Sequence, residues 1–315
     1  MFESPVEIAA PDISAYRRGN TGIPYVTTFQ SSRAGPHAVI TALVHGNELC
    51  GAWALVELFE RGIRPARGRL SLAFVNTAAY ERFDPRNPKA SRYLDEDLNR
   101  LWDRATLDGP RRSIELDRAR AIRPLIESAD ALLDLHSMQL PAPPLLLCGL
   151  PAKGRRLAEA IGYPGLVVAD AGHRGGVRMR DFGDFAEPSS PRTAMLVECG
   201  QHWAAASVEV AIATCKHFLA ALDLVAPAGL ARLWGADRPG SQRLIEVTHA
   251  ITVNGGPFHF TENFQGLEVI PKQGTLIGHD GAQPVRTPYD DCVLIMPSRR
   301  LGPGLTAVRL GRFVA

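Results

Sequence analysis

Cysteine is scarce in this chain, and its pattern is not that of a disulfide-rich protein. The 315 residues include five cysteines, an odd number, at wide spacing and without a C-x-x-C pair. This pattern favours reduced thiols in a cytoplasm over a disulfide framework or a cysteine zinc site. The first residues contain neither an apolar segment nor an early basic cluster, so we expect no signal peptide. No run of about 18 apolar residues occurs, so we also expect no transmembrane helix.

An excess of charge of either sign is also missing. The formal net charge is +2, and 22% of the residues are charged. Such a chain has no global field that would attract nucleic acid or a membrane surface, so we expect neither as a partner. The short pairs Arg111-Arg112 and Arg299-Arg300 are typical of solvated loops. A G-x-S-x-G elbow and a phosphate-binding glycine loop are absent, which argues against serine hydrolases and nucleotide-dependent enzymes.

Hydrophobic periodicity indicates an α/β fold. Residues 37–44 (HAVITALV) and 69–75 (RLSLAFV) are short apolar runs typical of buried strands, and helical spacing connects them over 48–61. We expect further strands at 131–135, 145–148, 166–168 and 195–197, helices at 114–128 and 208–222, and irregular loops at 76–108 and 172–191. The order predicts a central mixed sheet flanked by helices.

Composition changes after Leu224, where proline and glycine become frequent and helical periodicity ends. The length of the chain suits one large domain and one small domain. We therefore expect a catalytic domain over residues 1–224, a linker over 225–241 and a small β domain over 242–315.

Two histidines and a glutamate have the residue types and positions of a catalytic metal site. His45 and Glu48 lie in H-x-x-E spacing where a predicted strand passes into a helix, and His136 ends another predicted strand. Open α/β sheets build sites at the carboxyl ends of their strands. Three protein ligands with one open position are typical of catalytic zinc. Asp134 lies two residues before His136, on the same face of the strand, and suits a hydrogen bond to its imidazole.

Other polar residues suit catalysis beside such a metal. Glu198 ends an apolar strand, where a carboxylate is costly to bury unless it is paired or serves as a general base. Arg92, Asn99 and Arg100 lie in the segment SRYLDEDLNR, and such groups suit capture of a carboxylate or an oxyanion. We expect the remaining histidines to be structural, although His173 and His202 flank this region.

Four motifs together give the chain a family resemblance. HGNE, SRYLDEDLNR, DLHS and VECG occur in this order over roughly residues 37–220. They resemble the succinylglutamate desuccinylase and aspartoacylase family, which has a zinc carboxypeptidase-like fold. The segments GTLIGHDG and TPYDDCVLIMP extend the similarity more loosely into the C-terminal region.

The resemblance implies roles for individual residues. It makes one zinc ion the cofactor, with His45, Glu48 and His136 as its ligands. Glu198 would act as general base and then as acid, Arg92 would stabilise the oxyanion, and Asn99 and Arg100 would hold a substrate carboxylate. The family also has an arginine shortly before the catalytic glutamate. Here the possible matches are Arg178, Arg180 and Arg192, of which we expect Arg180 to bind substrate. A family tyrosine near the C-terminus has no match in SRRLGPGLTAVRLGRF.

We therefore predict a cytoplasmic zinc-dependent amidohydrolase, a deacylase that cleaves the N-acyl amide of a small molecule bearing a carboxylate. Two alternatives stay open: a zinc carboxypeptidase acting on peptides, and a non-catalytic ligand-binding protein with the same fold. A C-terminal region lying over the cleft would favour small substrates, and retention of Glu198 favours an enzyme. The TPYDDCVLIMP segment also leaves a homo-oligomer open.

Overall fold

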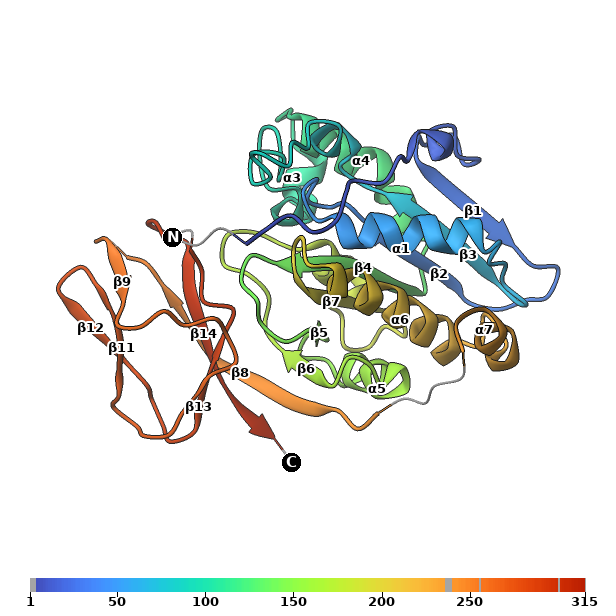
Figure 1. Ribbon diagram of the computed structural model, residues 1–315. Helices are drawn as coiled ribbons and strands as arrows, with labels where there is room; N and C mark the ends of the chain where they lie inside the picture. The colour runs from blue at the N-terminus through green and yellow to red at the C-terminus, as the bar shows by residue number, and fades with distance from the viewer. Residues whose placement is uncertain (1–3, 236–239, 255, 300, 315) are drawn as a thin grey trace.

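The structure is a computed structural model that describes residues 4–235, 240–254, 256–299 and 301–314. Within these ranges, eleven strands form one mixed sheet in the order β1-β3-β2-β4-β7-β5-β6-β8-β14-β13-β10 (Figure 1). The strands of this sheet are β1 (Val26–Gln30), β2 (His37–Ala42), β3 (Arg69–Phe74), β4 (Ala131–Met138), β5 (Leu145–Leu147), β6 (Leu166–Ala169), β7 (Thr193–Gln201), β8 (Arg243–Thr252), β10 (Val269–Ile270), β13 (Cys292–Ile295) and β14 (Thr306–Val314).

Helices cover both faces of the sheet, as Figure 1 shows. They are α1 (Leu49–Glu60), α2 (Thr77–Tyr80), α3 (Arg104–Asp108), α4 (Ile114–Glu127), α5 (Ala152–Ile161), α6 (Ala205–Ala221) and α7 (Pro227–Trp234). Leu55 of α1 and Phe218 of α6 pack in one core with Leu133 of β4, whereas Leu116 of α4 packs on the other face with Leu132. Alternation along β4 thus directs neighbouring residues into the two cores. The expected α/β fold with a mixed sheet flanked by helices is confirmed.

The strands β2, β4 and β7 are central, and their registers position the site. β2 and β4 are parallel, as are β4 and β7, and every residue of β2 and β4 is buried. Their apolar runs suit strands that are covered on both faces. Because parallel strands end at the same edge of the sheet, residues that follow β2 or end β4 and β7 lie close together.

The region 76–108 has more regular structure than we predicted. It contains α2, a 3₁₀ helix over Leu98–Arg100, and α3. Asn76 and Asp103 cap the two α-helices by accepting backbone N–H groups, which explains why such short helices form here. The fully buried Glu115 carboxylate accepts N–H groups from Leu94, Asp95 and Glu96 at 2.7 to 3.3 Å and so holds the rest of the segment in place. The sequence prediction also missed β1 and α5.

The C-terminal part of the chain continues the main sheet. β8 pairs in parallel with β6 and antiparallel with β14, and β9 (Phe258–Phe260), β11 (Leu276–Asp280) and β12 (Gln283–Arg286) form a separate three-stranded antiparallel sheet. The expected linker, 225–241, includes α7, and its residues 236–239 lie outside the described residues. The division into domains at 1–224, 225–241 and 242–315 stays a prediction.

The sequence led us to expect reduced cysteines and no transmembrane helix, and the structure bears on both expectations. All five cysteines are buried and free. Across the described ranges, no helix combines the length and apolar character that crossing a membrane requires.

Candidate metal centre and active-site cavity

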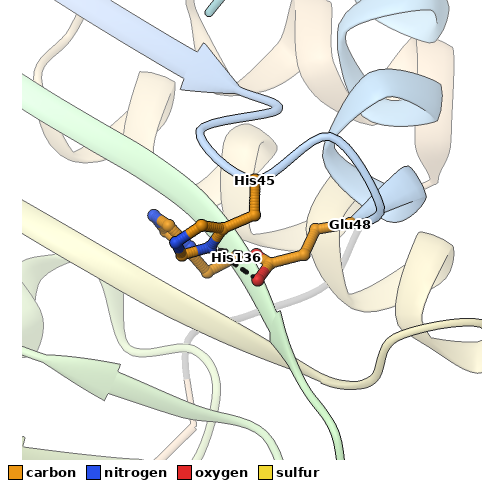
Figure 2. Close-up of side chains that lie close together, drawn as sticks. All are labelled: His45, Glu48 and His136. Carbon is orange, nitrogen blue, oxygen red and sulfur yellow. Dashed lines mark hydrogen bonds and ion pairs between the residues drawn. The ribbon is translucent and has the colours of Figure 1, made fainter. Parts of the chain in front are cut away.

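His45, Glu48 and His136 converge at the carboxyl edge of the sheet, as Figure 2 shows. His45 lies in the loop after β2, Glu48 immediately precedes α1, and His136 lies in β4, which extends to Met138. A Cβ at Gly46 would approach Tyr80 N to 2.5 Å and Ser91 O to 2.6 Å, so the loop can pack here only with glycine.

The three side chains meet through their polar atoms. His45 Nδ1 lies 2.8 Å from Glu48 Oε1, and His136 Nδ1 lies 2.9 Å from Glu48 Oε2. One ligand atom from each residue lies within 4.8 Å of the others, and all three side chains are buried. Two imidazole nitrogens and one carboxylate form the His₂Glu donor set that catalytic zinc sites use.

The outer nitrogens of both imidazoles have carboxylate partners. His136 Nε2 lies 2.8 Å from Asp134 Oδ2, and Thr41 donates to the other oxygen of Asp134 at 2.7 Å. The predicted contact between Asp134 and His136 is therefore confirmed. His45 Nε2 lies 2.9 Å from Asp97 Oδ1. These contacts leave both Nδ1 atoms facing the centre, as in metal sites whose ligand histidines are oriented by carboxylates.

The charges at this centre attract each other strongly. Burial would raise the pKa of Glu48, but the two adjacent histidines outweigh it and hold that pKa well below its usual range. Burial would lower the pKa of His136, but Asp134 and Glu48 hold it well above its usual range. A carboxylate this deeply buried stays ionised only because positive charge lies beside it, and an ionised carboxylate is the form that binds a metal ion.

Glu198 lies beside these residues without joining them. It pairs with His136 across the β4–β7 register and is 7% exposed. Within the described part of the chain, Glu198 Oε2 has no hydrogen-bond partner. Burial and the nearby charge of Glu48 raise the pKa of Glu198 to about 8. A buried, unpaired carboxylate with a raised pKa is typical of groups that transfer protons.

A cavity of about 360 Å³ opens over this centre. The expected residues His45, Glu48, Arg92, Asn99, Arg100, His136 and Glu198 all line it. His173 and His202, which sequence analysis assigned to structural roles, also line it. The C-terminal part of the chain contributes Gln265, Met296, Pro297, Ser298, Leu305, Thr306 and Arg309.

The loop arginines have different surroundings within the cavity. Arg92 Nη1 lies 3.2 Å from Glu48 and its Nη2 lies 3.2 Å from Asp97, so Arg92 is well neutralised at the metal centre. Arg100 Nη2 lies 4.0 Å from Asp97 and otherwise donates to the carbonyl of Asn99. Asn99 accepts the Met179 N–H at 2.9 Å, which fixes the direction of its amide.

The structure places Arg180 away from the cavity, contrary to our expectation. Its guanidinium donates to the carbonyls of Cys148 and Ala194 at 3.1 and 3.0 Å and to Asp181 at 2.5 Å. These contacts use the side chain to satisfy buried acceptors, so it does not lie where a substrate could bind. Arg192 also lies elsewhere, with its Nη1 donating to the carbonyl of Glu127.

Arg178 lines the cavity in its place, but two carboxylates neutralise it. It contacts Asp170 at 2.7 and 2.9 Å and Asp181 at 2.5 Å. Arg309, on β14, approaches Asp170 only to 3.6 Å. Sequence analysis missed Arg309 and Asp97, because an arginine in a β-strand and one acid in a charged run have no distinguishing local pattern.

The fold and the converging side chains define the class: an α/β protein with a His-Glu-His metal-binding triad at the edge of a mixed sheet. The sequence profile of the succinylglutamate desuccinylase/aspartoacylase catalytic domain matches residues 34–189. The chain belongs to the succinylglutamate desuccinylase/aspartoacylase family. Members are amidohydrolases acting on non-peptide C–N bonds, and this triad is typical of their zinc enzymes. No curated protein sequence gives a significant match.

Solved structures share the fold along nearly the whole chain. A succinylglutamate desuccinylase/aspartoacylase from Rhodobacter sphaeroides is 19% identical, with a TM-score of 0.64, covering 93% of this chain and 89% of that one. Product-bound EutE (DoeB), an ectoine utilization protein from Ruegeria pomeroyi, is 19% identical with a TM-score of 0.64, covering 91% and 88%. Succinylglutamate desuccinylase from Vibrio cholerae is 16% identical with a TM-score of 0.65, covering 93% and 94%. At these identities the similarity concerns the fold.

Proposed function

We propose that this protein is a zinc-dependent amidohydrolase that cleaves the N-acyl amide bond of a small molecule bearing a carboxylate. The observation that carries the proposal is the buried His45–Glu48–His136 triad with Glu198 beside it, because Glu198 has an oxygen without a partner in the described part of the chain. A site for binding metal alone has no use for such a carboxylate, which is costly to bury.

The donor set favours zinc as the metal. Two imidazole nitrogens and one carboxylate suit Zn²⁺, whereas Mg²⁺ and Ca²⁺ prefer sites made only of oxygen. His45, Glu48 and His136 would hold the ion, and Asp97 and Asp134 would orient the two imidazoles. Bound there, zinc would polarise the amide carbonyl and lower the pKa of a water molecule toward about 7.

The side chains around the triad divide the chemistry between them. Glu198 takes a proton from the attacking water and returns it to the leaving amine nitrogen. Arg92 contacts Glu48 and Asp97 and so lies at the metal centre. From there its guanidinium stabilises the negative charge that develops on the oxygen of a substrate carbonyl bound at this centre. Asn99 and Arg100 hold a carboxylate of the substrate and so fix its orientation.

The electrostatics of the cavity support an anionic substrate. Burial lowers the pKa of Arg100, and the charges of Arg92, Arg178 and Arg309 lower it further, while Asp97 partly compensates. Burial and the neighbouring arginines also lower the pKa of His173 to about 3. Cations that repel one another in a buried cavity are stabilised by a bound carboxylate.

The walls of the cavity favour a small molecule over a peptide. Residues on and beside β13 and β14, among them Met296 and Arg309, line the same cavity as Glu198. The C-terminal part of the chain thus occupies space that a peptide substrate of a carboxypeptidase would need. A volume of about 360 Å³ suits an N-acylated amino acid.

The proposal is tested by incubating zinc-loaded protein with N-acetyl, N-formyl and N-succinyl amino acids and measuring the released amine. We expect turnover with at least one of these classes and none with dipeptides that lack an acyl group. Zinc binding without turnover of any acyl amide would favour a binding protein. Faster cleavage of peptides than of acyl amino acids would favour a carboxypeptidase.

The compartment proposed is the cytoplasm. The five free, buried cysteines support it, because thiols persist in a reducing compartment. Nucleic acid and membranes are not proposed as partners, and assembly into a homo-oligomer stays a prediction.

A further inference from the structure

Part of the lining of the active-site cavity is apolar, and we call this part the apolar wall. The residues that form it are Met138, Leu140, Leu147, Leu196, Met296 and Leu305. They come from β4 and the loop after it, β5, β7 and the C-terminal part of the chain, so no single segment of the sequence reveals them as a group. None of these side chains has a role in holding a metal, moving a proton or binding a carboxylate.

The register of the sheet places this wall beside Glu198. On β7, Leu196 and Glu198 are two residues apart, so both side chains lie on the same face of the sheet. On the neighbouring strand, Leu147 pairs with Leu196, and Leu145 pairs with Glu198. Leu196 therefore lies next to the carboxylate along β7, and Leu147 lies beside Leu196 on β5, on the side of β7 opposite to β4 and His136.

The apolar surface is held rigidly. Leu147 and Leu196 belong to a buried cluster with Val168 and Ile245, and Met296 packs against the same cluster. Leu147 is 4% exposed and Leu196 is 2% exposed. Because packed side chains of this kind cannot turn away, a ligand that enters the cavity contacts hydrocarbon at this wall.

The cations nearby do not make this wall a second carboxylate site. Asp170 and Asp181 neutralise Arg178, Asp170 also lies 3.6 Å from Arg309, and Arg180 lies outside the cavity. A second charged group placed against the hydrocarbon of Leu147 and Leu196 would lose part of its hydration, and these two side chains offer it no hydrogen-bond donor.

We propose that the substrate carries an apolar group of several carbons, bound against Leu147, Leu196 and Met296, in addition to its carboxylate. This inference rests on the proposed function and specifies its substrate class: N-acyl amino acids with an aliphatic side chain or an aliphatic acyl group. The group excludes water from the space beside Glu198, and its burial contributes to binding in proportion to its area.

Two substrate series distinguish the side chain from the acyl group. The first holds the acetyl group constant and lengthens the amino acid from alanine through 2-aminobutyrate and norvaline to norleucine. The second holds alanine constant and lengthens the acyl group from acetyl to hexanoyl. Each buried methylene is worth about fourfold. We therefore expect kcat/KM to rise up to roughly 60-fold over the three methylenes of the first series, or up to roughly 250-fold over the four methylenes of the second. N-acetylaspartate and N-acetylglutamate should be poorer substrates than N-acetylnorleucine.

Three variants with the same polar replacement locate the effect. Leu305→Gln and Met296→Gln alter the wall. Leu305 is 42% exposed and Met296 is half-buried, so the fold should tolerate both substitutions. Leu150→Gln is the matched control, since Leu150 is 53% exposed and does not line the cavity. We expect the ratio of kcat/KM between the longest and shortest substrates to fall threefold or more in the first two variants and to stay unchanged in the control.

Binding measurements separate this inference from the proposed function. In Glu198→Gln protein, where we expect turnover to be slow, calorimetry measures the affinity for both series. Affinity that rises with chain length supports the apolar subsite even if wild-type protein hydrolyses no amide, in which case only the enzymatic proposal fails. Affinity and kcat/KM that stay flat along both series, or that favour the acidic amino acids, overturn the inference while leaving amide hydrolysis intact.

Discussion

Glu198→Gln is the substitution that separates a catalyst from a binding protein. The replacement keeps the size and shape of the side chain, adds an N–H donor and removes the base. Three carboxylates line the described cavity, and two of them are engaged: Glu48 contacts both histidines, and Asp97 contacts His45 and Arg92. Glu198 is the third, and no other cavity carboxylate is free to replace it.

The expected loss follows from this lack of a substitute. Loss of a general acid–base group costs roughly 10²- to 10⁴-fold in rate, or about 3 to 5 kcal/mol of barrier. Because no other cavity carboxylate can take over, we expect the upper part of the range, a loss of about 10³- to 10⁴-fold in kcat. Zinc content should stay near one ion per chain, because Glu198 is not among the three residues that converge.

The assay combines zinc stoichiometry by mass spectrometry with amine release by fluorescence. Glu187→Gln is a matched control, because Glu187 is an exposed glutamate in the loop before β7 that contacts Ser189. It should keep both zinc and turnover. His45→Ala should lose both together. If Glu198→Gln protein retained wild-type turnover with full zinc content, the base would lie elsewhere, and the reasoning from burial and missing partners would be refuted.

Other substitutions test the remaining parts of the site. Arg100→Ala should mainly raise KM, because it removes a contact to the bound substrate, and Arg92→Ala should mainly lower kcat, because an oxyanion contact forms only in the transition state. Steady-state kinetics on the true substrate measures both effects, and full activity of both variants would contradict the assignment. Asp134→Asn should weaken zinc affinity roughly 10- to 100-fold in a competition titration, since the imidazole loses its orienting carboxylate, and unchanged affinity would remove Asp134 from the metal site. Burial would raise the pKa of Asp170, but the charge of Arg178 outweighs it and lowers that pKa to about 2. The lowered pKa stabilises the fold by about 2 kcal/mol above about pH 4, the pKa of an aspartate in the unfolded chain. This stabilisation is lost as the pH falls through about 2, the pKa of Asp170 in the folded protein. The difference in unfolding free energy between wild type and Asp170→Asn, measured in urea, should therefore shrink on acidification, and a constant difference would show that Asp170 is not ionised in the folded protein.

Much of the fold is determined by local pattern. The central strands are continuous apolar runs, because both of their faces are covered, and the helix that follows His45 has a clear apolar stripe. Residues 37–75 were predicted in the right order for this reason. β1, with mostly half-buried residues, lacks such a pattern and was missed. α5 was missed although it is amphipathic, with Leu157, Ala158 and Ile161 buried, because no side-chain cap marks its start.

The candidate metal residues were predictable because each lies next to a feature visible in the sequence. His45 and Glu48 flank a strand-to-helix junction, His136 and Glu198 lie near strand ends, and parallel strands bring such ends to one edge. The convergence of the first three therefore follows from sheet geometry and from the order of the chain.

Which arginines reach the cavity was decided only by the tertiary structure, because distant segments supply their partners. Arg178, Arg180 and Arg192 lie close together in the sequence, yet only Arg178 lines the cavity, because buried carbonyls and Asp181 hold Arg180. Arg309 reaches the same cavity through the pairing of β14 with β8 and of β8 with β6. The direction of a guanidinium depends on which acceptors the folded chain leaves unsatisfied, and those acceptors belong to strands far away in the sequence.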